Sequence, residues 1–424
     1  MGRGRVTAFQ DSNHRHESHR EPRLSATDVE PGGWVFDAVI VPTARPVACL
    51  AEAAQLAEAL GCPLVTLHST ERTCAAEAAW RLGGDVDLIA IDVPPEPGRL
   101  NLPDWQTSGL LAGTVFERCS DVSTKRNLAL MLGYMLGWSR VLFLDDDITE
   151  LDPGDMRAAG PLLDGHNAVG FHNDGYPDTS VVCHAHRMAG VRQQVFFGSG
   201  ALAVELTRSR SFFPDVYNDD WFFLLDGDRH LQPMTVKGHI HQHPYDPFRS
   251  PDRARSEELG EVLAEGLYWL MDQNRSIAEA DQRYWSGFLP RRAQFIRSVL
   301  ELVETAAADP HEKDCQIAAL RGSLGRLLLI TPALCERYLH AWEADQQQWR
   351  HHLNRLPVGL RRSAALAMLA RPGAPGLSWR LTGPGPQRPG VAVGAEGAHH
   401  VAQEPADPAR RWLTCSDSGA PSSV

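Results

Sequence analysis

The sequence contains few cysteines and no long apolar run, and both absences exclude classes of protein. Its eight cysteines are scattered over 424 residues, without the C-x-x-C pair that zinc or redox sites use. We therefore expect reduced thiols in a cytoplasmic protein. The N-terminal residues lack the apolar segment of a signal peptide, and no later run approaches the ~20 apolar residues that a membrane helix needs. We therefore expect no membrane span.

The chain also lacks an excess of positive charge. Its formal net charge of -12 would repel a phosphate backbone, which argues against nucleic acid as a partner. A nucleotide stays possible because a bound metal ion can neutralise a diphosphate locally. The hydrophobic content of 43% is enough for the core of one large domain or two smaller ones.

Composition divides the chain into four segments. Residues 1–32 are polar with hardly an apolar anchor, and residues 371–424 are rich in proline and glycine, so both ends are predicted to be disordered. Residues 33–249 alternate strands with helices, the order typical of a mostly parallel sheet flanked by helices. Residues 250–370 carry apolar residues at helical spacing. The predicted fold class is therefore α/β with a C-terminal helical subdomain.

Short β-branched runs and helical stretches define the elements of the first half. Strands are predicted over 36–41, 64–67, 88–91 and 141–144, and helices over 46–60, 74–82 and 123–136. The last of these strands runs directly into Asp145, Asp146 and Asp147. Ligands of open α/β sheets bind beyond the carboxyl ends of strands, so this acidic cluster lies where a site is expected.

Three adjacent carboxylates are unfavourable together, because they raise one another's pKa unless a positive charge lies among them. A divalent cation is the simplest source of that charge, and Mg²⁺ or Mn²⁺ combines a few carboxylates with substrate phosphates and water. In an extended segment Asp145 and Asp147 would point one way and Asp146 the other. The alternative is an acidic loop or the first turn of a helix.

Several motifs together resemble the nucleotide-sugar-binding half of GT-A glycosyltransferases. They are TKRNLAL from Thr124, the pair Gly137-Trp138 and VLFLDDDI from Val141. In that family, an Arg-Asn pair opens a helix and the next strand ends in a D-x-D metal motif. The resemblance implies a GT-A fold in which Asp145 contacts the ribose side of the nucleotide and also the metal. It implies that Asp147 binds Mn²⁺ or Mg²⁺ and that Asp146 contacts the donor.

The resemblance also implies donor contacts at other strand ends. Thr43 and Arg45 follow the first strand and would contact the base or the diphosphate, and Asp92 ends the third strand and would reach the base edge. An ordinary strand-to-helix turn is the alternative. Lys125 and Arg126 open the helix before the acidic cluster, where cations and free N–H groups favour phosphate, unless they are solvated surface charges.

Gly198 and Gly200 lie in the segment FGSGA, which starts at Phe197. In the family a small-residue strand at this place faces the donor sugar and the acceptor, and glycine allows close approach of the backbone to a ligand. The same residues satisfy the G-x-G-x-x-A pattern of a dinucleotide site, with an acidic pair about twenty residues on. This alternative is disfavoured because the segment after Gly200 is too brief for a crossover helix.

Asp219 and Asp220 precede a run of aromatic residues and resemble the family's second acidic pair, in which a carboxylate acts as general base or orients the acceptor hydroxyl. Asp220 aligns with the second acidic residue of that pair and Asp219 with the first. An aspartate N-cap on the helix that contains Trp221 is the alternative.

His239, His241 and His243 alternate, so an extended segment would place all three on one side. Many GT-A enzymes complete the metal shell with a histidine in this region, and the resemblance implies His241. Solvent-facing or core histidines are the alternative. A histidine ligand is frequent in retaining members of the family, whereas a base at Asp220 fits inversion.

The sequence therefore predicts a metal-dependent glycosyltransferase with a nucleotide-diphospho-sugar donor and a small-molecule, lipid or glycan acceptor. A sugar-phosphate nucleotidyltransferase is an alternative, although the loop PTARP from Pro42 lacks the glycines of a pyrophosphate loop. A non-catalytic nucleotide-sugar-binding protein is the other alternative, since a sequence does not show turnover.

Overall fold

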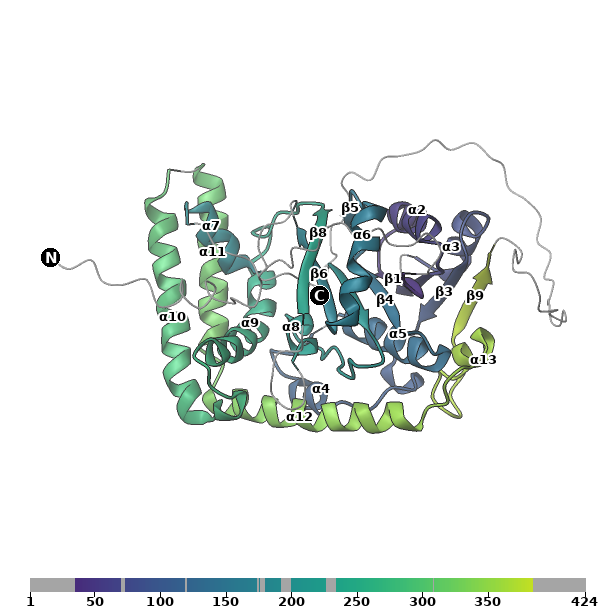
Figure 1. The fold of residues 1–424 in the computed structure, drawn as a ribbon. Helices are drawn as coiled ribbons and strands as arrows, with labels where there is room; N and C mark the ends of the chain where they lie inside the picture. Colours follow the sequence, from purple (N-terminus) through teal and green to yellow (C-terminus); the bar gives the residue numbers. More distant parts are fainter. Residues whose placement is uncertain are drawn as a thin grey trace, which may run out of the picture.

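Four neighbouring parallel strands of the sheet are the ones that the sequence predicts (Figure 1). The computed structural model describes residues 35–69, 73–118, 120–173, 175, 180–191, 200–225, 234–307 and 309–383. Parallel strands lie in the order β3-β2-β1-β4, with bounds β1 (Ala38–Thr43), β2 (Leu64–Ser69), β3 (Leu88–Val93) and β4 (Arg140–Leu144). The predicted helices between them are α2 (Ala51–Leu60), α3 (Ala75–Leu82) and α5 (Val122–Leu136), and the short α4 (Gln106–Leu111) precedes α5. The predicted alternation of strands and helices is confirmed.

Antiparallel pairings on both sides of this group make the sheet mixed. β7 (Ala201–Glu205) pairs antiparallel with β4, and β6 (Ala168–Asn173) pairs antiparallel with β7. β8 (Met234–Gln242) runs parallel to β6, and β5 (Ile148–Thr149) runs antiparallel to β8. β9 (Ser378–Thr382) pairs antiparallel with β3 at the other edge. The order β5-β8-β6-β7-β4-β1-β2-β3-β9 is that of an α/β fold with a mixed, largely parallel sheet.

The strands contribute alternate residues to two hydrophobic cores, one on each face of the sheet. In β1, Ala38 and Ile40 belong to one core and Val39 and Val41 to the other. A strand buried on both faces needs apolar residues at every position, which is why β1 is a continuous apolar run in the sequence. On one face α5 covers the strands and ends at Gly137, whose φ of 74° closes the helix in the left-handed conformation.

The C-terminal helices continue the core on the face that α5 covers. They are α9 (Pro251–Asp272), α10 (Gln282–Thr305), α11 (Pro310–Leu327), α12 (Pro332–Arg355) and α13 (Arg362–Ala367). The predicted start of α9 is confirmed, because the Ser250 side chain accepts a hydrogen bond from Asp252 N and Pro251 is the first helical residue. Leu263 of α9 belongs to the same core as Ile40 of β1, so the helices pack continuously with the sheet.

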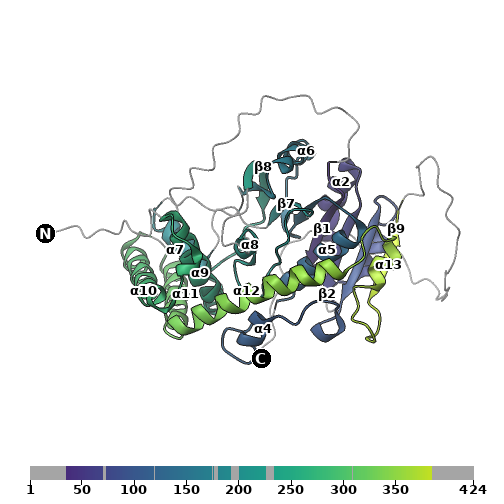
Figure 2. The same cartoon turned by 60° about the horizontal axis from the view of Figure 1, so that its bottom comes forward.

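Helix α12 runs from the other C-terminal helices beneath the sheet to the edge that carries β9 (Figures 1 and 2). Asp345 of this helix accepts hydrogen bonds from Gln106 N at 2.7 Å and Thr107 N at 2.9 Å, at the start of α4 (Gln106–Leu111). Trp349 Nε1 donates to Ser211 O at 2.8 Å. These buried polar contacts attach α12 to loops of the α/β layer.

Shorter elements complete the described part of the chain. They are η2 (Val47–Leu50), η3 (Pro97–Arg99), α6 (Pro153–Ala159), η4 (Pro161–Asp164), α7 (Val181–Met188), α8 (Asp219–Phe223) and η5 (Ile277–Glu279). η2 lies within the helix predicted over 46–60, which therefore begins as a tighter 3-10 turn.

The predicted C-terminal tail starts later than residue 371. Residues 371–383 belong to the folded part, because β9 pairs with β3. Arg362, at the start of α13, and Asp87, directly before β3, form a two-bond ion pair with N–O distances of 2.5 and 2.7 Å. The sequence did not indicate this strand, because a short exposed segment beside glycines forms a strand only where a neighbouring edge is unpaired. Residues 1–34 and 384–424 lie outside the described residues.

No single helix in the described ranges is long and apolar enough to cross a membrane. One pair, α11 with α12, passes the test of length and composition when both are taken together across their 80° bend. In this structure α11 packs on α9 and α10, and α12 packs on α10 and α4.

Removal of β9 should expose the edge of β3 and destabilise the protein. We expect a chain that ends at residue 376 to melt a few degrees below the full-length chain, because it loses the β3–β9 hydrogen bonds and the contacts of half-buried Trp379. A chain that ends at residue 383 retains β9 and is the matched control. Differential scanning calorimetry compares them, and equal melting temperatures for the two truncations would contradict a structural role for β9.

Candidate active site

The three aspartates lie directly after β4, at the carboxyl end of the strand and beside the end of β1, where the sequence predicts a site. The backbone does not stay extended here but closes a turn directly after Asp145. Asp145 therefore contacts Arg126, whereas Asp146 and Asp147 both contact Arg45. The predicted alternation of these side chains is wrong, because alternation requires extended backbone.

Side chains from the end of β1 hold Asp146 and Asp147. Thr43 Oγ1 donates to Asp146 Oδ2 at 2.6 Å. The Arg45 guanidinium lies 3.0 Å from Asp147 Oδ2 and 3.4 Å from Asp146 Oδ1. The Arg45 side chain is 49% exposed, so it can move when another charged group enters. Thr43 and Arg45, both predicted to contact the donor, are thus in contact with the acidic cluster.

Arg126 is buried between the acidic cluster and the later acidic pair. Its guanidinium lies 2.8 Å from Asp145 Oδ1 and 3.1 Å from both carboxylate oxygens of Asp219. The guanidinium also lies over the ring of Phe213, 5.3 Å from its centroid. Burial by itself would lower the pKa of Arg126, but Asp219 and Asp145 raise it above its ordinary value. Arg126 is therefore a buried cation, and the solvated-surface alternative is wrong for it.

Burial and the neighbouring charges together set the pKa of Asp145. Burial raises this pKa and Arg126 lowers it, while Asp147 and Asp146 raise it further, and the result is a pKa of about 6. A second positive charge close to Asp145 would favour the ionised form. A cation should therefore bind this cluster more tightly as the pH rises through 6. Above that pH the Asp145 carboxylate is already ionised, and the cation does not have to displace a proton.

The acidic pair lies at the start of α8, on the other side of Arg126 from Asp145. Asp219 accepts a hydrogen bond from Ser123 Oγ at 3.0 Å in addition to its bonds with Arg126. Asp220 is also buried, and its Oδ1 accepts from Trp221 N at 3.0 Å. The N-cap of α8 is Asn218, so the interpretation of the pair as an aspartate N-cap is wrong.

Lys125 is buried, and protein groups occupy its ammonium. Its Nζ lies 2.8 Å from Thr43 O, 2.5 Å from Ser69 Oγ and 2.9 Å from Asp121 Oδ1. An ammonium has three N–H donors, and these contacts fill them. Lys125 therefore joins α5 to the ends of β1 and β2, and the predicted phosphate contact would require one of these bonds to break.

Asp92 supports the start of α3, where its Oδ1 accepts from Ala75 N at 2.7 Å. His68 lies beside it on β2 and bonds two threonine hydroxyls. Burial lowers the pKa of His68 to about 4, against a raising effect of Asp92, so this histidine is neutral. A contact between Asp92 and a nucleotide base stays a prediction.

Gln242 is a site residue that the sequence analysis missed. Its Nε2 lies 3.3 Å from both carboxylate oxygens of Asp147, and its Oε1 accepts from Asn173 Nδ2 at 2.8 Å. Gln242 stands between His241 and His243, and side chains alternate along a strand. The same alternation that predicts one side for the histidines also predicts that Gln242 faces the opposite side.

The predicted metal ligands are the carboxylates of Asp145 and Asp147 and the imidazole of His241. Among the described residues, Asp145, Asp147 and His241 do not form a group whose three ligand atoms all lie within 4.8 Å of one another. The ring of His241 lies 6.4 Å from that of His243, and His239 lies 5.2 Å from His172. The carboxylates suit Mg²⁺ or Mn²⁺, which take most other ligands from phosphate and water. The donor set thus fits such an ion, and the role of His241 stays a prediction.

Gly200 supports the acidic cluster from the start of β7, because its carbonyl accepts a hydrogen bond from Asp145 N at 2.8 Å. Gly198 lies outside the described residues. The chain after Gly200 forms β7, antiparallel to β4. A dinucleotide fingerprint requires a helix at this point, so that alternative is wrong.

Comparison with known proteins adds a distant structural similarity. No protein-family model matches the chain, and no curated protein matches it. Its fold is similar to the crystal structure of a candidate nucleotide-diphospho-sugar transferase from Desulfovibrio desulfuricans G20, at 10% identity and a TM-score of 0.25. The match covers 62% of this chain and 97% of that chain. A similarity this distant says nothing about the reaction.

Loss of the Arg126 guanidinium should cost far more than loss of an exposed one. We expect Arg126→Met to lower the free energy of unfolding by about 3–5 kcal/mol, because it leaves the buried carboxylate of Asp219 and the half-buried carboxylate of Asp145 without their cation. Arg81→Met is the matched control, because Arg81 pairs with Glu77 on the surface, where such a pair contributes less than about 1 kcal/mol. Urea unfolding measures both, and equal losses would show that the buried bridge contributes no more than a surface pair.

Proposed function

We propose that this chain is a metal-dependent glycosyltransferase that transfers a sugar from a nucleotide-diphospho-sugar donor to an acceptor hydroxyl. The observation that carries the proposal is the bridge through Arg126. This bridge joins Asp145, in the acidic cluster after β4, to Asp219, in a separate acidic pair on α8. A donor-binding site and a base for the acceptor are two acidic centres that such an enzyme needs close together.

The acidic cluster would bind the diphosphate end of the donor. Asp147 and Asp145 are the proposed ligands of a Mn²⁺ or Mg²⁺ ion, which would neutralise the diphosphate and stabilise it as a leaving group. Arg45 supplies positive charge to Asp146 and Asp147 in the structure. Because Arg45 is half exposed, we infer that it turns from the carboxylates to the diphosphate when donor and metal bind.

The acidic pair would act on the acceptor. Asp219 is held by Arg126 and Ser123, which makes it a positioning residue in the proposal. Asp220 is the proposed general base, which accepts the proton of the acceptor hydroxyl as the oxygen attacks the anomeric carbon. The bond from the sugar to the diphosphate breaks in that step, and the diphosphate carries away the electron pair.

A panel of nucleotide sugars tests the activity directly. The full chain with Mn²⁺ is incubated with each donor, and mass spectrometry detects either hydrolysis of the donor or transfer to an added acceptor. We expect turnover of at least one donor, abolished by a chelator. Nucleotide binding that is independent of metal, without turnover of any donor, would instead favour a non-catalytic nucleotide-sugar-binding protein.

Asp147→Ala should abolish metal-dependent nucleotide binding and leave the fold intact. Losing even a group that only orients a metal ligand costs roughly 10–100-fold in affinity, so losing a direct ligand should cost at least as much. Calorimetric titration with UDP and GDP, with and without Mn²⁺, measures the effect. Asp164→Ala, at an exposed aspartate that pairs with Arg140, is the control. Unchanged affinity in Asp147→Ala would remove Asp147 from the site.

Asp220→Asn should retain donor binding and lose transfer by roughly 10²–10⁴-fold, because the amide does not accept a proton. Asp219→Asn provides the comparison, because it weakens the bonds to Arg126 and should also lower the melting temperature. Steady-state kinetics and thermal melts separate the two variants. Wild-type turnover in Asp220→Asn would refute the assignment of Asp220 as the base.

A further inference from the structure

A buried polar network lies behind the acidic pair, between α9 and α10. Arg292 of α10 is fully buried, and its guanidinium lies 2.9 and 3.2 Å from the Glu258 carboxylate and 2.8 Å from Glu265. Its distance to Glu261 is longer, at 3.7 Å. The network therefore places more carboxylates than cations in the interior, and Glu261 is the one that Arg292 holds least closely.

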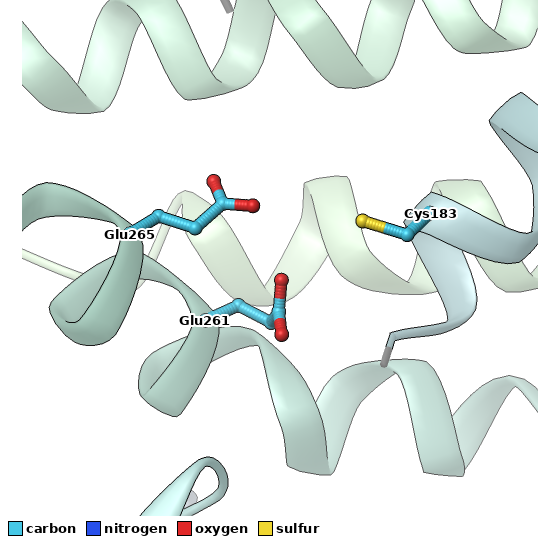
Figure 3. A group of neighbouring side chains, drawn as sticks. All are labelled: Cys183, Glu261 and Glu265. Carbon is cyan, nitrogen blue, oxygen red and sulfur yellow. The ribbon is translucent and has the colours of Figure 1, made fainter. Parts of the chain in front are cut away.

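Cys183 of α7 lies beside two of these carboxylates, Glu261 and Glu265 (Figure 3). The ligand atoms of Cys183, Glu261 and Glu265 all lie within 4.8 Å of one another, a spacing that a metal ion could bridge. Arg292 already supplies positive charge to Glu265, and the Ser180 side chain hydrogen-bonds Glu261. Protein groups thus already contact the carboxylates of this cluster. Glu261 has a further partner outside it.

Glu261 accepts a hydrogen bond from Asn218, the residue directly before the acidic pair. The distance from Asn218 Nδ2 to Glu261 Oε1 is 2.8 Å, and both side chains are buried. Asn218 has φ 61° and ψ 37°, a left-handed conformation that costs energy for residues with a side chain and that asparagine tolerates best. Its carbonyl accepts from Trp221 N at 3.0 Å, which starts α8. The bond to Glu261 therefore stabilises the backbone turn that orients the pair.

Helix α9 touches the segment on both sides of the acidic pair. On one side, a Cβ added to Gly260 would lie 2.1 Å from Tyr217 O, so only glycine permits this approach of the helix. On the other side, Tyr268 Oη donates to Trp221 O at 3.0 Å. The backbone from Tyr217 to Trp221 thus lies along α9, with the Glu261–Asn218 bond between the two contacts.

We infer that Glu261 is a positioning residue that holds Asp219 and Asp220 toward Arg126 by fixing the left-handed turn at Asn218. The C-terminal helices then contribute to catalysis from behind the site, without contact to the substrate. The inference rests on the proposed function for its effect on turnover, whereas its structural part stands without that function.

Paired substitutions test this role. Glu261→Ala removes the acceptor for Asn218. Glu265→Ala, one helical turn further on, instead removes a closer partner of Arg292 and keeps the Glu261 acceptor. Asn218→Gly removes the donor of the same bond, while glycine still adopts the left-handed turn and the ion pairs of Arg292 stay intact. This variant replaces Glu261→Ala in the test if Glu261→Ala does not fold. In the double variant Asn218→Asp/Glu261→Gln the donor and acceptor exchange places.

Hydrogen exchange of the amides of α8, melting temperature and steady-state kinetics are measured for each variant. We expect faster exchange at Trp221 and Phe222 in Glu261→Ala and Asn218→Gly, with kcat about 100-fold lower and donor KM unchanged, since small misplacements of reacting groups cost this much. Glu265→Ala should lose stability without either effect. The double variant should recover kcat to within roughly threefold of wild type, because the bond is restored.

Unchanged exchange of α8 in Glu261→Ala and Asn218→Gly would overturn the inference, whether or not any nucleotide sugar is turned over. Equal effects of Glu261→Ala and Glu265→Ala on kcat would also overturn it, because they would show a general loss of stability. If no donor is turned over by the wild-type chain, the proposed function fails, and the exchange data still decide whether Glu261 fixes the turn.

Discussion

The arrangement of the site depends on one guanidinium placed among carboxylates in the interior. Arg126 contacts Asp145 and Asp219, which belong to segments far apart in the sequence. A buried ion pair of this kind adds little net stability, because the desolvation of its members offsets their attraction. Its effect is on geometry, since neither carboxylate can move away without leaving a charge unpaired. The distance between the two acidic centres is therefore fixed by electrostatics and not by packing alone.

The C-terminal helices are part of this arrangement and not an appended domain. They share a hydrophobic core with one face of the sheet, and α12 binds loops of the α/β layer through Asp345 and Trp349. Helix α9 lies along the backbone that carries the acidic pair. The site thus has two supports: the sheet orients the aspartates after β4, and the helices orient those on α8.

Local sequence patterns predicted the elements and the place of the acidic cluster, because apolar periodicity and strand order determine both. They did not predict features that depend on tertiary partners. Lys125 is buried because oxygens at the ends of β1 and β2 bind its ammonium together with Asp121 at the N-cap of its own helix, and β9 forms because β3 offers an unpaired edge. Gln242 contacts Asp147 because β8 places alternate side chains on opposite sides, a contact that the spacing of the histidines does not identify by itself. The periodicity of apolar residues predicts a helix or a strand, but the contacts of its side chains depend on the elements that pack against it.

The pairing of β9 with β3 has a consequence for the synthesis of the chain. Strand β3 leaves the ribosome long before β9, so its edge carries unsatisfied N–H and C=O groups during most of translation. An open edge of this kind is a template for pairing with other nascent chains. The yield of correctly folded protein in a cell should therefore be more sensitive to the last residues of the fold than the stability of the finished molecule is.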